Sequence, residues 1–248
     1  MSCFVKNPNL PENNVRCVVC GELCTELNDY LDSKGIERLV MAPNADIDPA
    51  VKFHADMAVL YLGDGKVIVD KNQKSLIAGL ESLGLSVYLT ERNIAGEYPE
   101  DIALNFTLIS NKILGHFKYA DNILLDCAEK LTRINVRQGY CKCSCLVIDA
   151  NSLITDDKSI YDKAAENGLE CLLIAKGDIV LSGHEYGFIG GASAKISKDE
   201  VLFFGDITKH RDYKKIAVFL EKHGCKIISL NFPLTDFGGI IPITEKAP

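Results

Sequence analysis

Three cysteines at alternate positions could supply a nucleophile. Cys141, Cys143 and Cys145 lead into an apolar run of the chain. Alternate side chains of an extended segment face the same side, so the spacing predicts that the three thiols share one face. A thiolate is the reactive form of cysteine, and a neighbouring charge or imidazole, such as Lys142 or His54, would activate one of them. The alternative is that these thiols are buried apolar side chains, as free cysteines commonly are.

A histidine and an aspartate, His54 and Asp56, stand two residues apart at the start of another apolar run. On an extended chain this spacing brings imidazole and carboxylate to one side, where they can orient a base or bind a cation. The alternative is structural: the histidine caps the beginning of the strand and the aspartate makes a turn hydrogen bond.

Two glycine pairs, Gly190-Gly191 and Gly238-Gly239, each follow a short segment that contains an acid. No helix follows them directly, so neither is a phosphate-binding loop. Their recurrence predicts one structural position in two repeated units, where the backbone passes too close to its neighbours for a side chain. The acids before them, Glu185 and Asp236, would point toward the axis of the repeat.

A recurring set of elements must position these residues. Four apolar stretches of helical period each end at a glycine and are followed by a buried strand, which is typical of a helix that ends with a residue of positive φ. The glycines are Gly35, Gly84, Gly168 and Gly224. Strand pairs precede the helices, and Asp64-Gly65 supplies the clearest hairpin turn. The hairpins are expected at residues 58–69, 104–114, 145–155 and 194–204. The repeating unit is therefore ββαβ.

About five such units fit in the 248 residues, at steps of about 40–50 residues. They open near His54, Asn105, Cys143, Gly190 and Gly238, and the N-terminal segment completes the last unit. We expect one domain over residues 1–248. The stretch 119–138 holds no clear copy of the helix, glycine and strand pattern. An alternative is an ordinary α/β sheet protein, in which a helix, a glycine and a strand follow one another without forming a repeated unit.

Composition limits the classes of function. The chain is 47% hydrophobic and 25% charged, with a net charge of −7, which argues against a basic surface for nucleic acid. We expect a cytoplasmic protein, because neither a membrane span nor a signal peptide is evident. In a cytoplasmic protein we expect the ten cysteines to be reduced thiols. Cys17, Cys20 and Cys24 lack a second ligand pair at zinc-finger spacing, so a structural metal is not expected.

Five ββαβ units with these motifs resemble the pentein fold, the α/β-propeller of guanidino-group-modifying enzymes: arginine deiminases, dimethylarginine hydrolases and amidinotransferases. His54-Ala-Asp56 resembles the His-x-Asp strand of arginine deiminases, and Asp236-Phe-Gly-Gly is similar to their Glu-Gly-Gly-Asp element. The resemblance covers most of the chain as architecture and implies the fold class: α/β, pentein-like, with a pseudo-five-fold axis.

The order of the motifs departs from that family. Its enzymes carry the nucleophilic cysteine in the last unit, whereas this chain has no cysteine after Cys225. A cyclic shift of the units around a five-fold ring keeps the same neighbours. Two units after His54, where the family order would put the nucleophile, lie Cys141 and Cys143.

The resemblance then implies a cysteine-dependent hydrolase or transferase for a small cationic guanidino or amidine compound, arginine-like, with no cofactor and no metal. Cys143, or else Cys141, would attack the electrophilic carbon, and His54 would move the protons. The carboxylates that would hold the cation are Asp56, Asp236 and Glu185. The alternative, favoured by the missing C-terminal cysteine, is a catalytically inactive pentein that binds a small molecule or a protein. The oligomeric state stays open.

Overall fold

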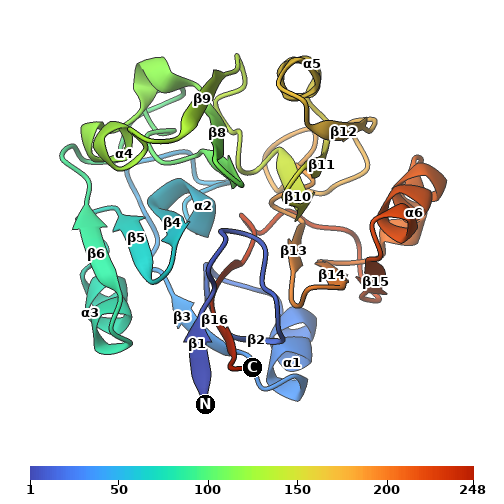
Figure 1. Cartoon of the computed structure of the whole chain (residues 1–248), viewed down its shortest axis with the longest axis horizontal. Helices are drawn as coiled ribbons and strands as arrows, with labels where there is room; N and C mark the ends of the chain where they lie inside the picture. Colours follow the sequence, from blue (N-terminus) through green and yellow to red (C-terminus); the bar gives the residue numbers. More distant parts are fainter.

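Five small β-sheets surround a common axis in the computed structural model, which describes residues 1–248 (Figure 1). In four of them an antiparallel strand pair is followed by a helix and by a third strand parallel to the second. Their strands are β4 (Val59–Gly63), β5 (Lys66–Val69) and β6 (Ser86–Leu89); β7 (Thr107–Ile109), β8 (Lys112–Gly115) and β9 (Thr132–Asn135); β10 (Cys145–Asp149), β11 (Ser152–Thr155) and β12 (Glu170–Leu173); and β13 (Ser193–Lys195), β14 (Glu200–Phe203) and β15 (Lys226–Ser229). The connecting helices are α3 (Lys74–Ser82), α4 (Asn122–Cys127), α5 (Lys158–Glu166) and α6 (Tyr213–Lys222), and short 3-10 turns are η1 (Phe117–Tyr119) and η2 (Ile207–Lys209).

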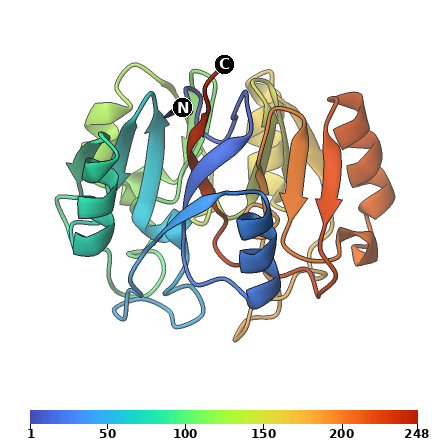
Figure 2. The same cartoon turned by 90° about the horizontal axis from the view of Figure 1, so that it is seen from below.

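The fifth sheet closes the ring with both ends of the chain. Its elements are β16 (Ile241–Lys246), β2 (Val15–Cys20), α1 (Thr25–Ser33), β3 (Glu37–Val40) and β1 (Ser2–Phe4). β16 pairs antiparallel with β2, β3 pairs parallel with β2, and β1 adds to the outer side of β16. The two termini consequently lie at the same end of the molecule (Figure 2). The predicted architecture of five ββαβ units is confirmed, and the alternative of one ordinary α/β sheet is wrong.

Local backbone signals explain most of the elements. Asp64 and Gly65 both have positive φ, 48° and 71°, as a two-residue hairpin turn requires. The glycines predicted to end helices also have positive φ: Gly35, Gly84, Gly168 and Gly224. The stretch 119–138, where no copy was expected, holds α4 and β9. This helix has six residues and is followed by Ala128 rather than by a glycine.

The hydrophobic core lies between neighbouring units. Side chains alternate along each strand, so one unit packs against two neighbours. Leu60 and Ile68 contact the β7–β9 unit, whereas Tyr61 and Val67 contact the unit formed by the chain ends. The helices that connect the second and third strands of each unit, α1 and α3 to α6, pack on the outside of the ring (Figure 1). Because each strand packs against two units, it is hydrophobic on both faces. This packing also holds the segments that lead into the strands in a defined position. None of the helices has the length and apolar character needed to cross a membrane.

Candidate active site

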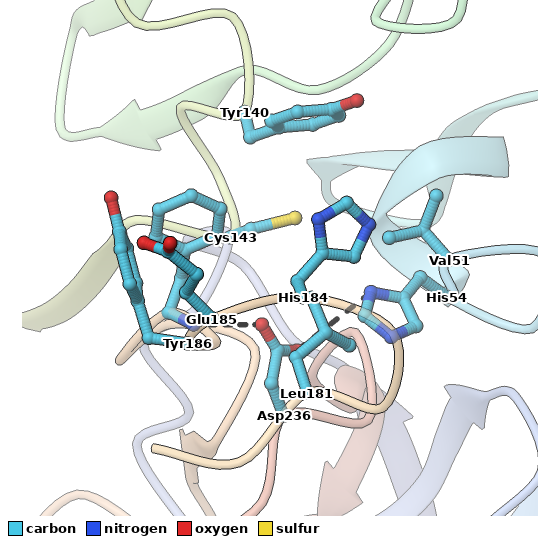
Figure 3. A pocket seen from close by; sticks show the side chains of 10 residues that line it. Val51, His54, Tyr140, Cys143, Leu181, His184, Glu185, Tyr186 and Asp236 are labelled. Carbon is cyan, nitrogen blue, oxygen red and sulfur yellow. Dashed lines mark hydrogen bonds and ion pairs between the residues drawn. The ribbon is translucent and has the colours of Figure 1, made fainter. Parts of the chain in front are cut away.

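The segments that lead into the first strands of four units converge on one cavity of about 330 Å³ (Figure 3). Its lining residues are Val51, His54, Tyr140, Cys143, Leu181, His184, Glu185, Tyr186, Phe188 and Asp236. The repeat therefore explains the site: equivalent segments of different units meet around the axis, although they are far apart in sequence.

His54 lines this cavity, and Asp56 lies beside it on a helical turn, not on the extended segment that the spacing suggested. α2 (Ala55–Ala58) begins directly after His54, whose carbonyl accepts the Met57 N–H at 3.1 Å. His54 is 4% exposed and Asp56 is fully buried. One donor atom of each lies within 4.8 Å of the other and of the Cys143 sulfur. The pair thus meets as predicted, but by a different backbone conformation.

The three clustered thiols do not share a face. Residues 140–144 form a turn, in which the Ser144 N–H donates to the Tyr140 carbonyl at 3.0 Å. The turn directs Cys143 toward the cavity (Figure 3). Cys141 and Cys145 instead pack into the apolar cluster between the β7–β9 and β10–β12 units, with Ile109 and Ile134 among others. Cys143 is therefore the only cysteine that lines the cavity.

Asn105 holds the Cys143 turn in place. Its Oδ1 accepts the N–H groups of Lys142 at 2.7 Å and Cys143 at 3.3 Å. Its Nδ2 lies 3.1 Å from the Cys143 sulfur and 3.1 Å from the Asp56 carbonyl oxygen, and the residue is fully buried. The sequence analysis gave this asparagine no role. Its position at the start of a unit, equivalent to His54 and Cys143, is the signal that could have identified it.

Asp236 is a second buried carboxylate of the site. It accepts the N–H groups of Phe188 at 2.8 Å and Gly238 at 2.9 Å, and its Oδ1 lies 3.7 Å from Nδ1 of His54. A Cβ at Gly191 would fall 1.9 Å from Oδ1 of Asp236, and one at Gly238 would fall 2.3 Å from His54. The predicted close approach of the glycine pairs is thereby confirmed.

Glu185 differs from the other predicted acids. It is exposed and lines the cavity at its rim, beside Tyr186 (Figure 3). It is therefore placed to meet the outer part of a bound molecule rather than its innermost atoms.

Burial and charge shift the pKa values of two central groups. Both carboxylate oxygens of Asp56 are buried without a hydrogen-bond partner. Burial raises the Asp56 pKa to about 6, although His54 and Lys142 oppose the shift. Burial and the nearby charges of Asp56 and Asp236 hold the pKa of the Cys143 thiol well above its ordinary value. Both effects favour the thiol over the thiolate, so burial and the two carboxylates oppose the activation that the sequence analysis expected from neighbouring groups.

His54, Asp56 and Cys143 could also hold a metal ion, because each offers one donor atom within 4.8 Å of the other two. An imidazole, a carboxylate and a thiolate form a donor set that suits zinc.

Replacing Asp56 with asparagine is expected to stabilise the protein at neutral pH. The folded-state pKa of about 6 exceeds the ordinary value of 3.8, so between these values the native state binds a proton that the unfolded state has lost. The free energy of unfolding therefore falls as pH rises through this window. Asp56→Asn removes that loss and should be more stable than the wild type at pH 8 by about 1–3 kcal/mol, but not at about pH 4.

Urea denaturation at both pH values measures this difference. Asp29→Asn, on an exposed face of α1, makes the same chemical change outside the site and serves as the control. An equal pH dependence in wild type and Asp56→Asn would contradict the assigned pKa shift.

A family model described as "Family of unknown function (DUF6873)" matches residues 18–241. The chain belongs to this family. A search of curated proteins gives no match.

Solved structures with the same fold are enzymes that act on guanidino groups. The inosamine-phosphate amidinotransferase of Streptomyces griseus superposes with a TM-score of 0.64 at 12% identity, covering 99% of this chain and 97% of that one. A saxitoxin-pathway amidinotransferase of Microseira wollei gives 0.59 at 10% identity, covering 99% and 98%. A dimethylarginine dimethylaminohydrolase of Pseudomonas aeruginosa, in complex with citrulline, gives 0.53 at 10% identity, covering 88% and 92%. These similarities show that the chain has the pentein fold, as the resemblance implied.

Proposed function

We propose that this protein is a cysteine-dependent enzyme that breaks a C–N bond of a small guanidino or amidine compound. The observation that carries the proposal is a set of four buried groups. A thiol, an imidazole and a carboxylate line one cavity, and a second carboxylate lies within 4.8 Å of the thiol sulfur: Cys143, His54, Asp236 and Asp56. Burying two carboxylates beside a thiol costs stability unless a cation compensates them, and perturbed groups of this kind concentrate in active sites. The amidinotransferases and the hydrolase with the same fold support the same class of substrate.

A cationic substrate would also activate the nucleophile. The charges of Asp56 and Asp236 contribute to the raised pKa of Cys143. An amidinium held between these carboxylates by charge-assisted hydrogen bonds cancels their effect and favours the thiolate. The His54 imidazole, one ring nitrogen of which lies within 4.8 Å of the Cys143 sulfur, would accept the thiol proton. The enzyme would then be reactive mainly when the substrate is bound.

The reaction has two stages. The Cys143 sulfur forms a bond to the central carbon, and the C–N bond to the leaving amine breaks as His54 gives that amine a proton. The amidino group is then attached to sulfur. In a hydrolase, water attacks this carbon and gives a proton to His54, and the C–S bond breaks to release the Cys143 thiol. In a transferase, an acceptor amine attacks the carbon in place of water, and the same proton transfer and bond breaking follow. The Asn105 amide, 3.1 Å from the sulfur, stabilises the thiolate at both stages.

The order of units fits one pentein domain over residues 1–248. Its chain begins and ends at a different unit of the ring than the motif order of the family's enzymes implies. The unit of Cys143 follows that of His54 after one intervening unit, and Asp236 precedes the strand that closes the ring. Its 3.7 Å separation from Nδ1 lets Asp236 orient the His54 ring. We assign the nucleophile to Cys143 rather than Cys141, because Cys141 packs in an apolar cluster outside the cavity.

Trapping the covalent intermediate tests this function. The protein is incubated with simple guanidino and amidine compounds and quenched in acid, and its intact mass and peptides are measured. We expect an added amidino group on Cys143, together with release of an amine or of ammonia. An unmodified Cys143 with no amine released from any compound of the panel would contradict the proposal.

A further inference from the structure

Apart from its chemical groups, the cavity is apolar and aromatic. Five of its lining side chains are Val51, Leu181, Tyr140, Tyr186 and Phe188. The Phe188 ring centroid lies 6.2 Å from that of Tyr140 and 6.0 Å from that of Tyr186, so the three rings form a continuous wall. Such a wall favours a flat apolar group over a hydrated one.

One ring of this aromatic wall, that of Tyr140, is anchored by its neighbours. The Tyr140 hydroxyl donates to Asp101 Oδ2 at 2.8 Å, and the Tyr140 ring lies 5.3 Å from that of Tyr98. Asp101 is 1% exposed, so this anchor is shielded from water. A preformed wall orders few groups on binding, which favours affinity for a ligand of matching shape.

The cavity lacks a cation that could receive a carboxylate. No lysine or arginine lines it, and its lining includes the acids Glu185 and Asp236. His184 stands at the rim, but its Nε2 already lies 2.9 Å from Oδ2 of Asp48.

Two lysines near these residues, Lys176 and Lys142, do not line the cavity. The Lys176 ammonium lies over the Tyr186 ring, 5.5 Å from its centroid, and 4.0 Å from Asp157. Lys142 lines a separate small pocket beside Ile240 and Pro242. The tail of a bound amidine would therefore meet apolar, aromatic and acidic groups, and the imidazole of His184, which is already bonded to Asp48.

We infer that the substrate carries its guanidino or amidine head on a flat, apolar tail without a carboxylate, unlike an α-amino acid. This inference rests on the proposed function for the position of the head, at Asp56 and Asp236. The aromatic wall then contacts the tail, and Glu185 repels an anionic group at the rim. A carboxylate would lose its hydration without gaining a partner, so the site discriminates against it.

A matched pair of ligands tests this inference by isothermal titration calorimetry. Benzamidine and 4-amidinobenzoate share the amidine and the ring and differ by one carboxylate. We expect benzamidine to bind the wild-type protein at least about tenfold more tightly. Equal affinities, tighter binding of 4-amidinobenzoate, or no binding of either compound would overturn the inference.

A charge reversal at the rim checks the cause of the preference. Glu185→Lys should reduce the ratio of the two affinities by about fivefold or more, since it replaces a repulsive charge with an attractive one. Glu81→Lys, on an exposed position of α3, makes the same change in net charge far along the chain and should leave the ratio unaltered. A ratio that falls equally in both variants would show a general charge effect and contradict the role of Glu185.

The two proposals fail separately. A protein that prefers benzamidine but forms no adduct on Cys143 would overturn the proposed function and leave the inferred ligand class standing. A protein that forms the adduct and binds both compounds equally would overturn only the inferred ligand class.

Discussion

Replacing Cys143 with alanine is expected to reduce turnover of guanidino compounds by about 10³-fold or more. The variant lacks the atom that would form the covalent intermediate, and no other cysteine lines the cavity. The change removes one sulfur from a buried site, so the protein should still fold with unchanged circular dichroism. Turnover is measured as amine release at saturating substrate.

Cys141→Ala is the matched control for this variant. It makes the same chemical change two residues away, in the apolar cluster between two units. We expect it to lower the free energy of unfolding by about 1–2 kcal/mol and to keep turnover within about threefold of the wild type. Activity that survives in Cys143→Ala, or disappears in Cys141→Ala, would contradict the assigned nucleophile.

Replacing His54 with alanine should have the second-largest effect, a loss of about 10²–10⁴-fold in turnover. The imidazole would take the thiol proton and return a proton to the leaving amine, and alanine can do neither. The variant leaves space beside Asp236, so added imidazole should restore part of the activity. His116→Ala, a partly buried histidine outside the cavity, controls for loss of a histidine as such. Full activity of His54→Ala, or equal rescue of both variants by imidazole, would contradict the proton-transfer role.

The fold could be predicted from the sequence because its signals are local and repeated. A glycine after each of four helices and hairpins between buried strands recur often enough to indicate the unit. The helix α4 was missed because it has only six residues and is followed by Ala128 rather than by a glycine. Its N-terminal cap, where Asp121 accepts the Ile123 N–H, is also found in ordinary turns.

Only one aspect of the site was predictable from the sequence: which residues meet, because the order of units around the ring determines it. That order brings together His54, Asp56, Cys143 and Asp236 from distant segments, as the cyclic shift implies. Local conformation was not predictable, because the four-residue α2 and the turn at 140–144 are too short to show periodicity. Which thiol faces the cavity depends on this turn and on packing between units, and neither is visible in residue spacing.

Selective alkylation of Cys143 tests the central claim most directly. 2-Chloroacetamidine carries the cationic amidine, and 2-chloroacetamide is its neutral counterpart of nearly the same shape. The native protein is treated with each reagent across about pH 5–9, and the modified cysteine is mapped by mass spectrometry.

We predict that the amidine reagent modifies Cys143 selectively, and at lower pH than the neutral amide, because its charge offsets Asp56 and Asp236. Modification spread over the more exposed Cys3, Cys24 and Cys127, or the same pH dependence for both reagents at Cys143, would contradict a substrate-activated cysteine enzyme.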